Sequence, residues 1–323
     1  MSTTGPSAPP AEGKRLPWSA IPAGLRAQVE DQLGGRVVRA VTQPGGFSPG
    51  VAARLELESG ARAFIKAVGD INPDSPGLHR AEARITAALP ASTPAPRLLA
   101  SVDADGWVIL LFEDIDGRIP RQPWEPAELR LVLGALTDLN RALTPSPIEA
   151  PLAATRFRNL GTGWHQFGQA LAAGSIELAD LPPWAGRHLD RLMDTESRWG
   201  AAVSGGSLAH GDMRADNLLL AGERVVFVDW PWACLAAPWF DLVIMLPSIA
   251  LQGGPPPEDV LAGHPLTDAA DPDAITVTVA ALAGMFCWTG RLPDPPGLPT
   301  LRAFQRAHAE VTLNWVRERT DWR

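Results

Sequence analysis

Residues 210–229 constrain this chain more than any other segment. They begin with His210-Gly-Asp-Met-Arg-Ala-Asp-Asn217 and end with the apolar run Arg224-Val-Val-Phe-Val-Asp229. Asp212 and Asn217 therefore stand five positions apart in a loop, and Asp229 closes an apolar strand twelve positions later. Phosphoryl transfer requires a carboxylate that orients a hydroxyl, and an amide and a second carboxylate that hold Mg²⁺. The segment therefore predicts a site that handles a metal-bound phosphate.

The N-terminal third carries the pattern of a small antiparallel sheet. Apolar or alternating runs are separated by Gly-rich turns and by an Asp-Gly turn, as in β-hairpins. The expected strands are residues 36–43, 51–58, 61–68, 97–102 and 107–112. A helix is expected from Pro76 to Leu89, with Ser75 as its N-cap and Pro90 after its end. These residues therefore predict a five-stranded sheet and one helix.

After residue 117 the pattern changes from strands to helices. The expected helices are residues 126–143, 184–203, 274–288 and 300–319. The chain therefore divides into a small lobe at 18–115 and a larger, mostly helical lobe at 116–323. The Ser-, Pro- and Gly-rich residues 1–17 are expected to form a disordered leader. The fold class is α+β with two lobes.

Lys66 is one of only two lysines, and it ends the apolar run Phe64-Ile-Lys66. A strand lysine can lie at a sheet edge with its ammonium in water, or it can bind the phosphates of a nucleotide. Glu82 favours the second interpretation. It falls on the apolar stripe of the helix at 76–89, where an unpaired buried charge costs several kcal/mol. We therefore expect Lys66 and Glu82 to form an ion pair.

The spacing of His210, Asp212, Asn217 and Asp229 resembles the catalytic loop and metal aspartate of kinases. It is most similar to the aminoglycoside phosphotransferase and choline kinase-like family, whose loop reads His-Gly-Asp. The resemblance covers roughly residues 36–320 and implies a protein-kinase-like fold. It implies the following roles: Asp212 as catalytic base, Arg214 near the γ-phosphate, Asn217 and Asp229 as Mg²⁺ ligands, and Asp241 as a brace of the loop.

The same resemblance implies that the small lobe binds ATP or GTP. Lys66, braced by Glu82, would hold the α- and β-phosphates. Gly46 and Ser48, in the turn between the first two strands, would approach the phosphates, although a hairpin turn also selects glycine. Glu113 and Ile115, in the link between the lobes, would hold the base through backbone groups. Phe64 takes the position where kinases keep a small residue over the purine.

The acceptor is expected to be a small molecule with a hydroxyl group. Gly211 replaces the arginine with which protein kinases grip a phosphorylated activation loop. Eleven residues lie between Asp229 and Asp241, too few for an activation segment and a peptide platform. An aminoglycoside or another antibiotic is therefore a candidate acceptor, and no protein partner is implied.

Two further groups of residues bear on the acceptor, and each has an alternative explanation. Trp230, Trp232 and Trp239 could surround a cationic acceptor, or they could pack in the core. The acidic residues of the segment 258–273 could attract ammonium groups, or they could line a solvated loop; they are Glu258, Asp259, Asp268, Asp271 and Asp273.

Two other functions fit part of the pattern. A catalytically degenerate member of the same fold would bind a nucleotide or ligand without turnover. A metal-dependent phosphohydrolase would use His210, Asp212, Asp216 and Asp229, and it would need no Lys66–Glu82 pair.

Composition limits the compartment and the partners. A net charge of −8 and a pI near 5.3 argue against nucleic acid or an anionic membrane. No run of about 18 uninterrupted apolar residues is present to span a membrane. The two cysteines, Cys234 and Cys287, imply no disulfide framework. We therefore expect a cytoplasmic protein.

Overall fold

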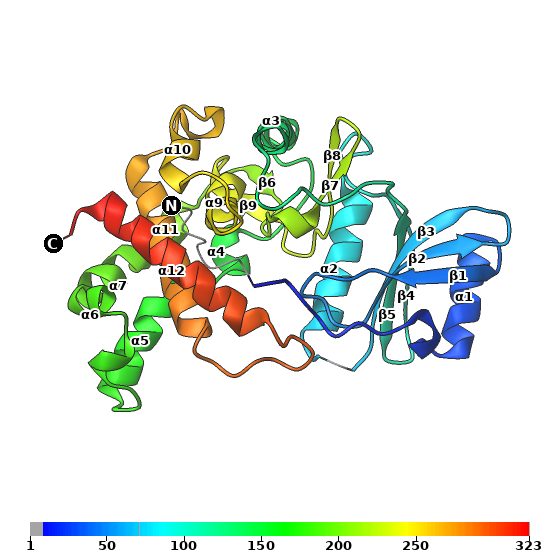
Figure 1. Cartoon of the computed structure of the whole chain (residues 1–323), viewed down its shortest axis with the longest axis horizontal. Helices are drawn as coiled ribbons and strands as arrows, with labels where there is room; N and C mark the ends of the chain where they lie inside the picture. Colours follow the sequence, from blue (N-terminus) through cyan, green and yellow to red (C-terminus); the bar gives the residue numbers. More distant parts are fainter. Residues whose placement is uncertain (1–8, 71, 323) are drawn as a thin grey trace.

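A five-stranded antiparallel sheet forms one end of the molecule in the computed structural model, which describes residues 9–70 and 72–322 (Figure 1). The strands are β1 Val37–Thr42, β2 Val51–Leu57, β3 Arg62–Val68, β4 Leu98–Ala104 and β5 Trp107–Glu113. Their order in the sheet is β1-β2-β3-β5-β4. The five strands expected from the sequence are confirmed, each within two residues at either end.

Two helices cover this sheet, whereas the sequence predicted one. The expected helix is α2, Ser75–Ala88, which packs on the face turned toward the rest of the molecule. The additional helix α1, Ala23–Leu33, covers the opposite face. It was missed because only Leu25 and Val29 of its residues are buried, too few to produce an apolar stripe. Its packing closes the outer core of the small lobe.

Residues 9–17 differ from the expected disordered leader. They run extended beside the loop between β1 and β2, where Glu12 and Arg15 form parallel bridges to Gly46 and Gly50. The backbone N–H of Lys14 donates to Gly297 O at 2.8 Å, so the segment also contacts the larger lobe. The remainder of the predicted leader, residues 1–8, lies outside the described residues.

The larger lobe is mostly helical. Its longer helices are α3 Pro126–Ala142, α5 Gly163–Ala172, α7 Leu189–Ser197, α9 Phe240–Leu251, α11 Pro272–Thr289 and α12 Leu301–Thr320. Its short helices are α4 Ala153–Arg156, α6 Pro183–Arg187, α8 Trp199–Ala202 and α10 Pro257–Leu261. The single helix expected over 184–203 is wrong, because the chain turns at His188 and at Arg198. These turns allow Trp184, Leu192 and Trp199 all to be buried.

Helix α11 forms the centre of the larger lobe. By length and composition it could cross a membrane, but half of its residues are buried within the protein. It contacts α5, α7, α8, α9 and α12, and Val279, Ala280 and Ala283 have no exposed surface. Burial of this kind explains the apolar composition of α11 as that of a core helix.

The segment 210–229 lies between and within two short, two-stranded antiparallel β-ribbons. Strand β6, Ser207–Ala209, pairs with β9, Cys234–Ala236, and β7, Leu218–Ala221, pairs with β8, Arg224–Phe227. The 210–217 loop leaves β6 and enters β7, whereas Asp229 follows β8. The ribbons therefore bring the two halves of the segment together at the boundary with α2 and the sheet (Figure 1).

Candidate active site

Buried hydrogen bonds to α9 hold the backbone of the 210–217 loop in place. Asp241, in the first turn of α9, accepts the backbone N–H of His210 at 2.7 Å and that of Gly211 at 2.8 Å. The His210 ring bonds to Val228 O at 2.9 Å through Nε2 and accepts the Asp212 N–H at Nδ1. Burial lowers the pKa of His210, so the ring is neutral. The hydrogen-bonding role that the resemblance implies for Asp241 is confirmed.

Steric constraints explain why glycine occupies position 211 in this loop. Its φ angle is +81°, and an added Cβ would lie 2.4 Å from the carbonyl oxygen of Trp232. A side chain therefore cannot occupy this position without moving the loop.

Asp212 is held by two neighbours. Arg214 Nη1 lies 2.6 Å from Asp212 Oδ1, and the Asn217 amide nitrogen lies 3.0 Å from Asp212 Oδ2. Arg214 also binds both carboxylate oxygens of Asp216 at 3.0 Å. Arg214 thus neutralises two carboxylates of its own loop. Burial raises the pKa of Asp212 to about 6, against the lowering effect of Arg214.

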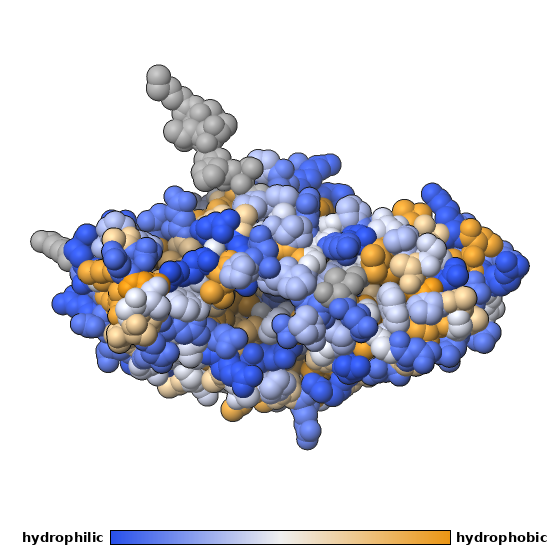
Figure 2. Space-filling view, turned by 90° about the horizontal axis from the view of Figure 1, so that it is seen from below, coloured by the Kyte–Doolittle hydropathy of each residue, from blue (hydrophilic) through white to orange (hydrophobic). Residues whose placement is uncertain are grey.

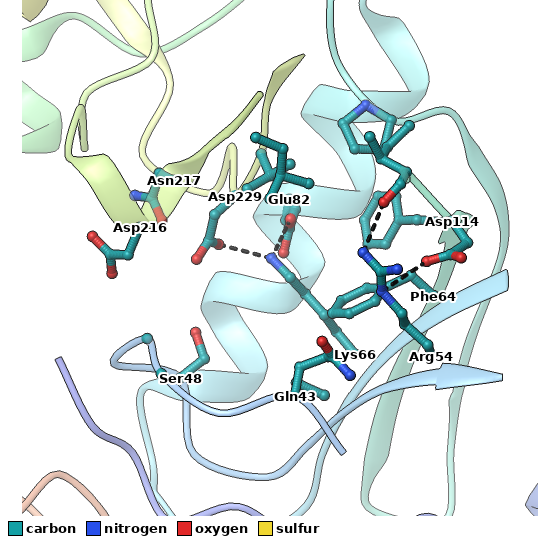
Figure 3. Close-up of a pocket in the computed structure, with 18 of the residues that line it drawn as sticks. Gln43, Ser48, Arg54, Phe64, Lys66, Glu82, Asp114, Asp216, Asn217 and Asp229 are labelled. Carbon is teal, nitrogen blue, oxygen red and sulfur yellow. Dashed lines mark hydrogen bonds and ion pairs between the residues drawn. The ribbon is translucent and has the colours of Figure 1, made fainter. Parts of the chain in front are cut away.

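Lys66 joins the two lobes at the site (Figure 3). Its ammonium lies 2.6 Å from Glu82 Oε1 and 2.9 Å from Asp229 Oδ1. The predicted Lys66–Glu82 pair is therefore confirmed, and Asp229 is an additional partner from the larger lobe. Burial opposes the charge on Lys66, but Asp229 and Glu82 outweigh it and raise the pKa of Lys66. Lys66 is therefore a cation at neutral pH.

All eight of the predicted nucleotide and metal residues line one cavity of about 250 Å³, which we call the first cavity. Its lining includes Gly46, Ser48, Lys66, Glu82, Glu113, Ile115, Asn217 and Asp229. The Ser48 hydroxyl comes from the loop between β1 and β2 and points toward the cavity (Figure 3). Phe64 also lines the cavity, opposite Phe112 in the strand register.

Asp114, in the link between the lobes, was not identified from the sequence. Its side chain is 2% exposed, and the Nε atoms of Arg54 and Arg62 each lie 3.3 Å from it. Arg54 also donates to Ile115 O at 2.8 Å. This network fixes the link at the point where a base would be held. No local pattern indicates it, because the arginines lie on β2 and β3, 60 and 52 residues before Asp114 in the sequence.

Arg15 is a second residue that the sequence did not indicate. It comes from the segment expected to be disordered, yet its guanidinium lines the first cavity. It donates to the backbone carbonyls of Gly45 and Ser48, which belong to the loop between β1 and β2. Arg15 therefore fixes the loop in the conformation that surrounds the cavity.

We expect Arg15→Gln to weaken nucleotide binding about tenfold. The loop between β1 and β2 loses charge-assisted hydrogen bonds that stabilise its conformation by about 1.5–3 kcal/mol, and a loss of about 1.4 kcal/mol in binding corresponds to a factor of ten. Lys14→Gln is the matched control, since it removes the same charge from an exposed neighbour. Isothermal titration with a nucleoside triphosphate compares the two variants. Equal affinities would show that Arg15 does not position the loop.

A second cavity of about 540 Å³ lies on the other side of the 210–217 loop. Asp212 and Arg214 line this second cavity and not the first. Four residues line both cavities: Ser48, His79, Glu82 and Asp229. The two cavities therefore meet at the charged cluster, with Asp212 facing one and Lys66 facing the other.

Of the two alternatives for the three tryptophans, core packing is confirmed for Trp230 and Trp239. Trp230 and Trp239 are 1% and 5% exposed and pack in the core. Trp232 does line the second cavity, but the guanidinium of Arg156 lies 4.5 Å from its ring. A cation of the protein therefore already contacts this ring.

The acidic residues of the segment 258–273 lie away from the second cavity. Glu258 pairs with Arg319 at 2.6 Å, and Asp273 pairs with Arg198. Asp268, Asp271 and Asp273 line a separate cavity between α3, α8 and α11. Attraction of an acceptor to the second cavity by this segment is therefore not supported.

Asn217 and Asp229 fit a magnesium ion. Asn217 uses its amide nitrogen on Asp212, which leaves its amide oxygen as a possible ligand. Asp229 uses Oδ1 on Lys66 and retains Oδ2. Mg²⁺ commonly binds one or two such protein oxygens together with substrate phosphates.

The ligand set of a phosphohydrolase is not assembled. Both ring nitrogens of His210 are engaged, and its side chain is fully buried. Within residues 9–70 and 72–322, no three His, Cys, Asp or Glu side chains gather as a metal-binding group. His210 therefore serves as a structural residue of the loop.

The sequence and the fold of this chain are similar to those of known proteins. Residues 57–275 match the model of the phosphotransferase enzyme family. A thermostable mutant of aminoglycoside phosphotransferase APH(4)-Ia has a TM-score of 0.60 at 11% identity, over 93% of this chain and 100% of that chain. A choline/ethanolamine kinase family protein from Mesorhizobium loti has a TM-score of 0.57 at 15% identity, over 93% and 94%.

These structural likenesses show the fold, and they confirm that it is protein-kinase-like. No curated protein matches the sequence closely enough to add to this comparison. The family model spans two thirds of the sequence, including β3, α2 and the 210–229 segment. The matched residues include Lys66, Glu82 and the carboxylates of the 210–229 segment, which the structure brings together. The chain therefore belongs to the phosphotransferase enzyme family.

Proposed function

We propose that this phosphotransferase is a small-molecule kinase, which moves the γ-phosphoryl group of ATP or GTP to a hydroxyl of a small acceptor. The observation that carries the proposal is the junction of the two cavities. Lys66 and Asn217 line the first cavity, Asp212 lines the second, and Asp229 lines both. A nucleotide in the first cavity and an alcohol in the second would meet at these residues.

In this proposal the residues divide the work of phosphoryl transfer. Lys66, held by Glu82, binds the α- and β-phosphates, while Asn217 and Asp229 hold Mg²⁺. The ion would neutralise charge on the phosphates. Asp212 orients the acceptor hydroxyl and takes its proton. A bond forms between the acceptor oxygen and the γ-phosphorus, the bond from that phosphorus to the β–γ bridging oxygen breaks, and the nucleoside diphosphate leaves.

Two further facts support a nucleotide and a small acceptor. The APH(4)-Ia structure is a ternary complex with ADP and hygromycin B, and it has the same fold. Between Asp229 and Asp241 this chain has only two turns, the three residues of β9, Cys234–Ala236, and the first residue of α9. That stretch offers no platform for a peptide substrate.

Nucleotide titrations test the proposal directly. ATP and GTP are titrated by calorimetry with MgCl₂ and with EDTA, and diphosphate release is then screened against neutral, anionic and cationic alcohols. We expect binding that requires the metal, and release that at least one alcohol accelerates. Absence of nucleotide binding in the presence of magnesium would contradict the proposal.

Activity should decline in mild acid. Asp212 must be ionised to accept a proton, and burial raises its pKa to about 6. The rate is therefore full well above pH 6 and falls as the pH drops through that value, about tenfold for each further unit. An ordinary aspartate, with a pKa near 4, would place this decline about two units lower. The profile of kcat/KM against pH measures it, and a midpoint near 4 would contradict the assignment.

A further inference from the structure

The second cavity is apolar over most of its surface. Aromatic side chains from six different segments line it, and α11 and the loop before α12 add aliphatic ones. Representative residues are Phe157, Trp232, Phe286, Phe304, Leu282 and Leu298. The molecule viewed from below is hollowed between its two ends, with hydrophobic residues visible inside the hollow (Figure 2). A cavity of about 540 Å³ is in the range that holds a drug-sized ligand.

The carboxylates of this cavity are already paired. Glu82 and Asp229 both bind Lys66, at 2.6 and 2.9 Å. Asp212 binds Arg214 at 2.6 Å. No other aspartate or glutamate lines the second cavity among the described residues. An acceptor with several ammonium groups would therefore find no free carboxylate beyond the catalytic cluster.

Two arginines of the lining have no carboxylate partner among the residues that the structure describes. Arg156, at the end of α4, donates to Pro231 O and lies over Trp232. Its Nε is buried without a hydrogen-bond partner. Arg158 is exposed at the cavity and takes part in no ion pair within the described chain. The uncommitted charge in the second cavity is therefore positive.

We propose that the acceptor is an apolar alcohol that carries a carboxylate and no cationic group. Its apolar body fills the cavity, its carboxylate lies beside Arg156 and Arg158, and its hydroxyl reaches Asp212. The inference rests on the proposed function for the phosphorylation of that hydroxyl, but the preference for an anion concerns binding alone. Burial of apolar surface favours binding of the body of the acceptor, and the arginines select its charge.

Three alcohols that differ only at one end test this inference: 10-hydroxydecanoate, 1,10-decanediol and 10-amino-1-decanol. Calorimetry measures their binding to the full chain with a nucleoside diphosphate and magnesium present. We expect 10-hydroxydecanoate to bind at least about tenfold more tightly than the amino alcohol, with the diol between them. Tightest binding of the amino alcohol, or measurable binding of none of the three, would overturn the inference.

Variants assign the preference to the two arginines. The double variant Arg156→Gln and Arg158→Gln should bind the three alcohols with nearly equal affinity. Arg158→Gln alone should reduce the preference in part, and it avoids disturbing the contact of Arg156 with Trp232. Arg130→Gln is the matched control, because Arg130 is an exposed arginine on α3 outside the cavity lining. An unchanged preference in the double variant would overturn the inference.

The two proposals fail separately. If 10-hydroxydecanoate is preferred but magnesium and nucleotide do not bind, the kinase proposal fails and the ligand class stands. If nucleotide binds and a cationic alcohol is phosphorylated fastest, the kinase proposal stands and the carboxylate inference is wrong.

Discussion

Asp212→Asn is expected to lower kcat about 1000-fold while nucleotide affinity stays within about threefold of wild type. The amide has the size of the carboxylate but cannot accept the proton of the acceptor hydroxyl. Asp212 does not line the first cavity, so its replacement leaves the contacts to the nucleotide in place. Diphosphate release measures kcat, and calorimetry measures nucleotide affinity.

Two controls separate loss of the base from loss of the fold. The thermal midpoint of Asp212→Asn should match that of wild type within a few degrees. Asp138→Asn makes the same change on α3, where the side chain is 75% exposed, and it should retain full activity. A kcat above half of the wild-type value in Asp212→Asn would refute the role of Asp212 as base.

Lys66→Met is expected to have the second largest effect, on both folding and binding. It leaves Glu82, which is 3% exposed, as a buried charge without its cation. Removal of one partner from a buried pair costs about 3–5 kcal/mol in the free energy of unfolding. The nucleotide also loses its phosphate cation, which should raise its Kd by about 10- to 100-fold.

A second substitution separates these two effects. The double variant Lys66→Met and Glu82→Leu removes the more deeply buried of the two carboxylates that lose Lys66, since the Asp229 side chain is 22% exposed. It should therefore recover most of the stability and none of the nucleotide affinity. The matched control is Arg80→Met on α2, the helix that carries Glu82. Arg80 lies 2.6 Å from Asp103, but both side chains are more than half exposed, so its loss should change the free energy of unfolding little. Chemical denaturation and calorimetry provide both measurements.

If nucleotide binds Lys66→Met with wild-type affinity, the lysine has only a structural role. If the double variant remains as unstable as the single variant, the burial of Glu82 is not the source of the cost.

The local chemistry of the site could be predicted because it depends on spacing along the chain. Asp212, Asn217 and Asp229 are separated by fixed numbers of residues, and the ribbons around them are too short to move them apart. The Lys66–Glu82 pair could be predicted for a different reason. A charge on the apolar stripe of a helix needs a partner, and the chain offers only two lysines.

Contacts between distant segments could not be predicted in this way. Arg15 was assigned to a disordered leader because its neighbours are Ser, Pro and Gly, yet its guanidinium holds the loop between β1 and β2. Arg54 and Asp114 are polar residues on unrelated segments, and only the register of the sheet brings them together. Helix α1 was missed because two buried residues leave too weak a periodicity.

The sequence by itself therefore determined the sheet, the α+β division into two lobes, the Lys66–Glu82 pair and the proximity of the loop residues, since each follows from periodicity or from a short spacing. Only the tertiary structure decided which side chains line the second cavity. The second cavity collects Arg156, Trp232 and Phe304 from three separate segments, and its charge depends on which carboxylates are already paired. Pairing and burial are properties of packing in three dimensions, so no local pattern in the chain records them.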